Sequence, residues 1–69
     1  MNPMKTIGAN VKRYRERRCM TQAALALKAR MDVGQVCRYE SGAGNITLKS
    51  LKSLADALGV TIVDLCIQE

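Results

Sequence analysis

The sequence predicts an all-α fold: one compact domain, residues 1–69, built from five short helices without strands. Apolar residues recur at helical spacing, and the segments that carry them begin at Asn, Thr or Asp and end near Gly. The chain has 69 residues and no repeat or linker, which fits a single small domain. Phe and Trp are absent, so the core must consist of aliphatic residues and Met, with the two Tyr.

The first helix is expected over residues 3–18. Asn2 can cap its start, and Pro3 falls in the first turn, where its missing N–H does no harm. Its buried stripe should consist of Met4, Ile7, Val11 and Tyr14.

Residues 21–42 predict two helices joined by a tight turn, over 22–29 and 33–41. Thr21 is a suitable N-cap for the first, and Asp32 with Gln35 has the spacing of a capping box for the second. Gly42 can end the unit in a left-handed conformation. Val36 and Tyr39 share one face of the second helix; the other face holds Val33, Gly34, Cys37, Arg38 and Ser41.

A fourth helix should begin after Thr47 and end at Leu58, with Gly59 as its stop. Thr61 and Asp64 cap a short fifth helix that runs to about residue 67. The inward face of the fourth helix is expected to hold Leu48, Leu51, Leu54, Ala55 and Leu58.

Charge is unevenly placed along the chain. The net charge is +5, but the first 38 residues hold nine Lys and Arg against two acidic residues, whereas residues 39–69 are net negative. A basic N-terminal part and an acidic C-terminal part favour an oriented approach to a polyanion, although a basic run can also be only a solvated helix face. No run of about 18 apolar residues and no signal-peptide pattern is present, so we expect a cytoplasmic protein without a membrane span.

Catalysis and metal binding are not expected. The chain has no His, no recognisable pair of carboxylates and no glycine-rich phosphate loop, so no enzyme activity and no cofactor is predicted. Cys19, Cys37 and Cys66 lack metal-ligand spacing and are expected to be reduced thiols. Cys66 should pack as a small hydrophobic residue, and a redox role for Cys37 is the alternative to a plain surface thiol.

Helix, short turn, helix is the pattern of a helix-turn-helix, whose second helix can enter the major groove of DNA. Arg38 is the leading base reader, through the O6 and N7 atoms of guanine, with a phosphate contact as its alternative. Gln35 can pair with adenine or serve only the capping box. Val33 offers an apolar contact to thymine, and Gly34 lets the helix lie close. The candidate base contacts are Val33, Gly34, Gln35, Cys37 and Arg38.

The segment resembles the helix-turn-helix of the Cro/C1-type (XRE) phage-repressor family, and the likeness extends over about residues 4–66. It rests on Thr21-Gln22, Leu25-Ala26, Val36 and Glu40-Ser41-Gly42 within the unit, on Ile7, Val11, Tyr14 and Arg15 before it, and on Leu48, Leu51, Leu54, residues 55–60 and Leu65 after it. The resemblance implies a five-helix, lambda-repressor-like domain that binds double-stranded DNA.

The resemblance also implies residue roles. Gln22 would grip a phosphate and brace the second helix, and Arg15 and Glu40 would form an internal ion pair, with DNA contact as the alternative. The candidate phosphate contacts are Gln22, Arg13, Arg17, Arg18, Lys28, Asn45 and Lys49. The chain departs from the family at Arg30 and Cys19, where Gly is usual, and in the loop after Gly42, which lacks the usual basic residues.

The C-terminal segment 61–67 is too apolar for one narrow core stripe. We expect Val60, Val63, Cys66 and Ile67 to form a dimer contact, although they could instead close the core of the monomer. A C2 dimer would place two reading helices about 34 Å apart and imply a palindromic operator.

These features predict a sequence-specific DNA-binding transcriptional regulator, a repressor or autoregulator, acting as a homodimer. Within the family the settings that fit are a phage-type repressor, a restriction-modification controller protein, and an antitoxin, which would also have a toxin as partner. The alternative from another class is a protein-interaction module that kept the fold without DNA function.

Overall fold

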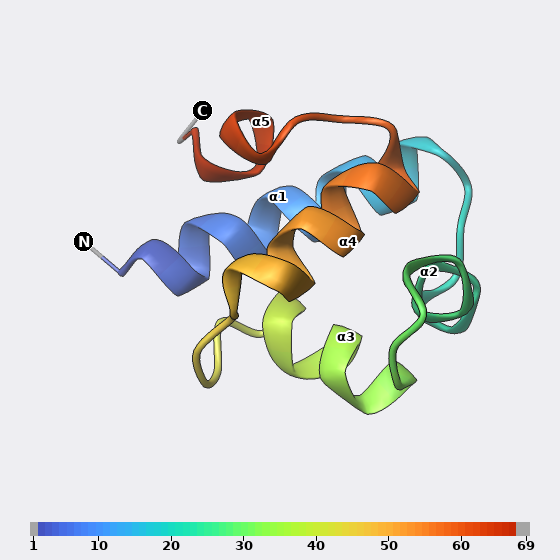
Figure 1. Ribbon diagram of the computed structural model, residues 1–69, viewed down its shortest axis with the longest axis horizontal. Helices are drawn as coiled ribbons and strands as arrows, with labels where there is room; N and C mark the ends of the chain where they lie inside the picture. Colours follow the sequence, from blue (N-terminus) through green and yellow to red (C-terminus); the bar gives the residue numbers. More distant parts are fainter. Residues whose placement is uncertain (1, 68–69) are drawn as a thin grey trace.

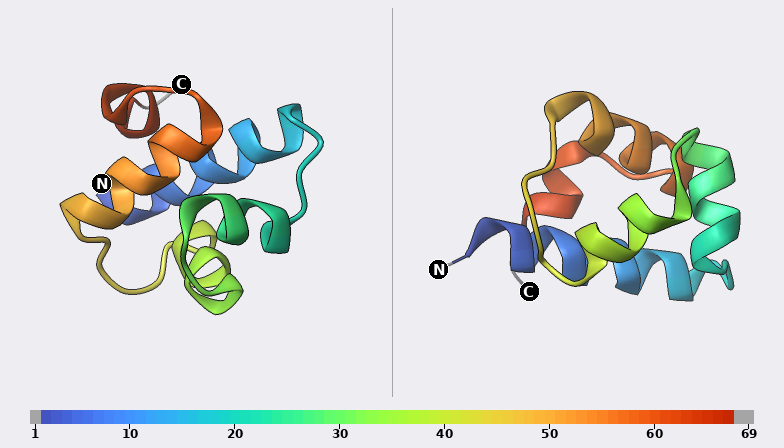
Figure 2. Two further views of the ribbon diagram at one scale, coloured as in Figure 1. Left: turned by 45° about the vertical axis from the view of Figure 1, so that its right-hand side comes forward. Right: turned by 90° about the horizontal axis from the view of Figure 1, so that it is seen from below.

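The computed structural model describes residues 2–67, and over this range it contains five α-helices and no strand. They are α1 (Pro3–Arg17), α2 (Gln22–Ala29), α3 (Val33–Glu40), α4 (Leu48–Leu58) and α5 (Ile62–Cys66). The predicted all-α fold is confirmed, and each expected helix end lies within one residue of the observed one. In Figures 1 and 2, α3 and α5 lie at opposite ends of the molecule, with α1 and α4 between them.

Local capping explains why the boundaries follow the sequence so closely. Asn2 accepts a hydrogen bond from the backbone N–H of Met4 at 3.0 Å, and Thr21 accepts from Ala24 at 3.0 Å. Thr47 caps α4 in the same way, and Thr61 forms a reciprocal capping box with Asp64. These bonds satisfy N–H groups that have no partner inside the helix.

The core lies where all five helices meet. Its fully buried residues include Val11 from α1, Leu25 from α2, Val36 from α3, Leu54 from α4 and Leu65 from α5. Met4, Tyr14, Met20 and Met31 pack against this cluster while remaining partly exposed. None of the helices over residues 2–67 is long and apolar enough to cross a membrane.

Two core predictions are wrong. Leu48 was expected to face inward, but its side chain is 72% exposed, because it lies in the first turn of α4 beside the preceding loop. Cys66 was expected to pack as a small hydrophobic residue, but it is exposed at the last position of α5. Helical spacing identifies the apolar face of a helix, but it does not show which residues at the ends of that face are left exposed by the neighbouring helices.

Two contacts of α1 carry the tertiary arrangement and are not visible in the sequence pattern. Gly8 lies against the C-terminal end of α3, where a Cβ atom would overlap the carbonyl oxygen of Tyr39 and lie 2.9 Å from that of Glu40. Asn10 is 2% exposed and donates from Nδ2 to the carbonyl oxygens of Leu65 at 2.8 Å and Ile67 at 2.7 Å. One glycine therefore allows α1 to touch α3, and one amide ties α1 to the end of α5.

Candidate nucleic-acid interface

The α3 helix is buried along one face and exposed along the other, as predicted. Val36 has no exposed surface and Tyr39 is 8% exposed. All five candidate base contacts, Val33, Gly34, Gln35, Cys37 and Arg38, are exposed. Nothing in the described part of the protein lies within 4 Å of a Cβ built at Gly34, so the start of α3 is open to a large partner.

The start of α3 is fixed by the predicted capping box. The backbone of Asp32 adopts an extended conformation, and its N–H donates to the side-chain carbonyl of Gln35 at 3.4 Å. Gln35 nevertheless remains exposed. Its capping role and its candidate base contact therefore compete for the same amide. The capping hydrogen bond, at 3.4 Å, is longer than the usual N–H···O bond and is therefore weak.

An ion pair ties the end of α3 to α1. The guanidinium of Arg15 binds both carboxylate oxygens of Glu40, with Nε to Oε2 at 2.7 Å and Nη2 to Oε1 at 3.1 Å. The side chains of Arg15 and Glu40 are only 12% and 5% exposed. Hydrogen bonding to Glu40 raises the pKa of Arg15 above its ordinary value, so Arg15 is charged at neutral pH. The predicted internal pair is present, and a charge buried this way is not presented to DNA.

Gln22 connects this pair to the outer face of α3. Its Nε2 donates to Glu40 Oε1 at 3.0 Å, and its Oε1 accepts from the thiol of Cys37 at 2.9 Å. The amide at the start of α2 is thus held in one orientation by two residues of α3. This is the bracing that the family resemblance implied; the phosphate contact of Gln22 stays a prediction.

Both turns that flank α2 contain a non-glycine residue with positive φ. Cys19 has φ 54° and Arg30 has φ 59°, the two positions at which the family usually has Gly. A side chain in the left-handed region costs on the order of 1 kcal/mol. At Arg30 the conformation lets the N–H of Met31 donate to Ala26 at 2.9 Å, which closes the C-terminus of α2.

Three cationic candidates, Arg13, Arg17 and Arg18, lie on α1 or at its C-cap and contact other residues of that helix. Arg13 donates to the side chain of Asn10 at 2.7 Å and so lies beside the end of α5. The guanidinium groups of Arg17 and Arg18 lie 5.6 and 5.4 Å from the ring centre of Tyr14. Their phosphate contacts remain predictions.

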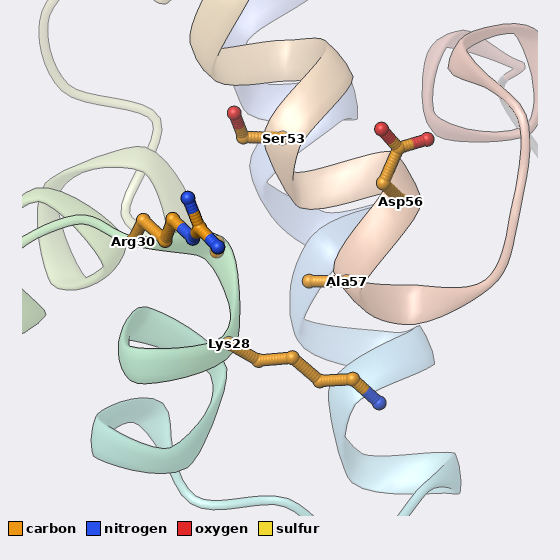
Figure 3. A pocket seen from close by; sticks show the side chains of 6 residues that line it. Lys28, Arg30, Ser53, Asp56 and Ala57 are labelled. Carbon is orange, nitrogen blue, oxygen red and sulfur yellow. The ribbon is translucent and has the colours of Figure 1, made fainter.

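Lys28 and Arg30 line a hollow between α2 and α4 (Figure 3). Ser53, Asp56 and Ala57 of α4 form its other side. An adjoining hollow contains Arg18 and Lys28 together with the C-terminal end of α4. No α3 residue lines either hollow, so the structure groups Arg18 and Lys28 with α4 rather than with the exposed face of α3.

The loop between α3 and α4 lies at the same end of the molecule as α3 (Figures 1 and 2). Asn45 is exposed on this loop, and Lys49 is exposed in the first turn of α4. A small hollow between this loop and α3 is lined by Gln35, Arg38, Tyr39, Gly44 and Asn45. The structure thus brings two candidate base contacts and one candidate phosphate contact together at one site.

Comparison with known proteins agrees with this arrangement. A family model described as "Helix-turn-helix" matches residues 11–65. The restriction-modification controller protein C.AhdI from Aeromonas hydrophila is similar in structure, with TM-score 0.87 and 26% identity over 90% of this chain and 94% of that one. A hypothetical transcription factor from Neisseria superimposes with TM-score 0.92 and 26% identity over 96% of this chain and 76% of that one. Among curated proteins no sequence matches the chain.

A similar domain also occurs within an enzyme. Hydroxypropylphosphonic acid epoxidase from S. wedmorenis matches with TM-score 0.86 and 30% identity over 96% of this chain, but this is only 35% of the enzyme chain. That likeness concerns one part of the epoxidase and carries no catalytic activity over to this protein. The match over residues 11–65, together with the geometry of α2 and α3, shows that the chain belongs to the XRE-type helix-turn-helix family of DNA-binding transcriptional regulators.

Proposed function

We propose that this protein is a cytoplasmic, sequence-specific transcriptional regulator that binds a palindromic operator as a homodimer. It represses its target genes or regulates its own gene. The observation that carries the proposal is α3 itself. Its inner face is buried at Val36 and Tyr39, and its ends are held by the capping box and by the Arg15–Glu40 pair. Its outer face is therefore a rigid and exposed surface of the kind that enters a major groove.

The start of α3 is the part best suited to read bases. In helix-turn-helix proteins the N-terminal residues of the second helix contact base edges. Here Val33 is 46% exposed and can contact a thymine methyl group, while Gly34 leaves room for close approach. Gln35 is also exposed near the start of α3, and it can pair with adenine when it leaves the capping box.

Dimerisation is proposed through the C-terminal patch of Val60, Val63, Cys66 and Ile67. Val63 is 63% exposed and Ile67 is 50% exposed, Cys66 is exposed, and Val60 is partly buried. Large exposed side chains grouped at one helix are more typical of an interface than of a monomer surface. A second copy related by two-fold symmetry would cover this patch and help so small a chain remain folded.

The test is selection of binding sites from a randomised duplex pool at about physiological salt, followed by sequencing. A palindromic motif with half-sites about 34 Å apart, one turn of DNA, is the expected result. Sedimentation at micromolar concentration, with and without the selected site, then measures the oligomeric state; a monomer on a single half-site would remove the dimer from the proposal.

The protein-interaction alternative is favoured by a different result of the same selection. If nothing is enriched and binding disappears as salt rises, the positive charge acts only as a non-specific footprint. The exposed Leu27, at 83%, and Leu48, at 72%, would then be the first surfaces to examine for a protein partner such as a toxin.

A further inference from the structure

The two hollows between α2 and α4 join into one groove, which we call the α2–α4 groove. Both hollows are lined by Lys28, Asp56 and Ala57. One of them extends to Arg30, and the other extends to Arg18. None of the residues that line the groove belongs to α3, so the groove is a surface separate from the candidate nucleic-acid interface.

The border of the α2–α4 groove carries positive charge that the protein does not neutralise. Arg18, Lys28 and Arg30 line it, and over residues 2–67 none of the three forms an ion pair. One carboxylate, that of Asp56, lies among them, but it is bound by Lys52 at 2.8 Å. Like charges gathered along a groove with low-dielectric walls concentrate a positive potential there, which attracts anionic groups.

The side chain of Arg30 is placed in the groove by an unusual backbone conformation. Arg30 has a φ of 59°, where a residue with a side chain costs on the order of 1 kcal/mol. Its side chain extends from the end of α2 toward α4 (Figure 3), yet it makes no hydrogen bond within residues 2–67. The fold therefore makes no use of the guanidinium that it holds at this cost, which favours a contact with another molecule.

The floor of the α2–α4 groove is apolar and made mainly of small side chains. Ala29 is 5% exposed and Ala57 is 6% exposed, and Met20 and Leu58 continue the floor in the adjoining hollow. Ser53 is half-buried on the α4 side, and its hydroxyl has no hydrogen-bond partner among the described residues. A cationic border around such a floor is complementary to a segment that combines carboxylates with aliphatic side chains.

A protein segment fits this groove better than DNA does. DNA that enters through α3 lies at the end of the molecule formed by α3 and the loop after it (Figures 1 and 2), and α3 does not line the groove. A duplex also presents phosphates without apolar side chains, and it would leave the apolar floor uncovered. Leu27, directly before Lys28, is 83% exposed and adds apolar surface beside the groove for a protein partner.

We propose that the α2–α4 groove is a docking site for an acidic segment of another protein. Carboxylates of that segment bind Arg18, Lys28 and Arg30, and its aliphatic side chains lie on Ala29 and Ala57. Because α3 is not part of the groove, the protein can bind this segment and DNA at the same time. The inference does not depend on the proposed function, since it concerns a different surface of the molecule.

The experiment titrates the isotope-labelled protein with a synthetic peptide that repeats Glu-Glu-Leu and has blocked ends. The amide resonances of Ser53, Ala57 and Gly59 should shift, and those of α3 should not. Lys28→Glu should weaken peptide binding by about tenfold, because an attractive charge at the centre of the groove becomes a repulsive one. Arg18→Glu tests the other end of the groove in the same way, and circular dichroism establishes that each variant is folded.

The matched control is Lys12→Glu. Lys12 is an exposed residue of α1 that does not line the groove, and its variant has the same net charge as Lys28→Glu. It should therefore change peptide binding by less than about twofold, since exposed charges farther apart than the Debye length are screened at physiological salt. A second control peptide with Gly in place of Leu should bind more weakly than the first, because it cannot cover the apolar floor.

Three results would overturn the inference. If Lys12→Glu weakens binding as much as Lys28→Glu, the peptide responds to net charge and the groove is not a site. If duplex DNA displaces the peptide and shifts the same groove amides, the groove is a contact for nucleic acid and not for a protein. If the peptide shifts no groove amide even at low salt, no acidic segment docks there. Shifts in the groove that persist with saturating duplex present would support it.

Discussion

Removing Arg15 should destabilise this protein far more than removing any surface cation. The variant Arg15→Met keeps most of the apolar stem of the side chain but loses two hydrogen bonds to Glu40 and one, at 2.8 Å, to the carbonyl of Met20. It also leaves the carboxylate of Glu40, which is 5% exposed, with Gln22 as its remaining donor.

The magnitude follows from burial. Breaking a buried pair by removing one partner costs about 3–5 kcal/mol, because the other charge loses its partner without regaining water. A chain of 69 residues has a total free energy of unfolding of roughly 3–10 kcal/mol, so Arg15→Met should lose a large share of it. The matched control is Lys52→Met, which breaks a pair whose side chains are 63% and 62% exposed and should cost at most about 1 kcal/mol.

Urea denaturation monitored by circular dichroism measures both variants, and a third variant identifies the cause. Replacing both partners, Arg15→Met with Glu40→Met, removes the stranded charge and should recover much of the lost stability. If Arg15→Met and Lys52→Met shift the midpoint equally, or if the double variant is less stable than Arg15→Met, burial of the charge is not the cause of the loss. Because the pair raises the pKa of Arg15, the stabilisation from the pair is present below the ordinary pKa of Arg15 and is lost only in strong alkali. Arg15 should therefore add no pH dependence to the free energy of unfolding from about pH 6 to about pH 9.

Four further substitutions have expected effects on stability, which thermal unfolding measures and, for Asn10, amide exchange as well. Gly8→Ala should cost about 3 kcal/mol because its Cβ would overlap the backbone of α3, whereas Gly34→Ala, with open space at its Cβ, should stabilise the helix by up to about 1 kcal/mol; equal effects would show that α1 and α3 are not in close contact. Asn10→Leu should cost about 2 kcal/mol by leaving two carbonyls at the end of α5 without a donor, and amide exchange in α5 that stays unchanged would contradict this role. Arg30→Gly should raise the free energy of unfolding by about 1 kcal/mol, because glycine adopts the positive φ of this position without strain. An unfolding temperature that is unchanged or lower would contradict this prediction.

The predicted helix boundaries succeeded because they depend on residues near one another in the chain. A cap such as Thr21 or Thr47 acts on an N–H three residues away, and a helical stripe repeats within one turn, so both can be read without the rest of the fold. The buried face of α3 at Val36 and Tyr39 was predictable for the same reason. The Arg15–Glu40 pair spans 25 residues and was reached only through the family resemblance.

The sequence by itself therefore determined the five helices, their caps and the exposed face of α3, since these follow from interactions over three or four residues. Only the tertiary structure decided which surfaces those helices cover. It buried Asn10 against a carbonyl 55 residues away, made Gly8 the contact between α1 and α3, left Leu48 exposed, and brought the guanidinium of Arg38 beside Gly44. Each of these depends on how close two distant segments come, and helical periodicity carries no information about that distance.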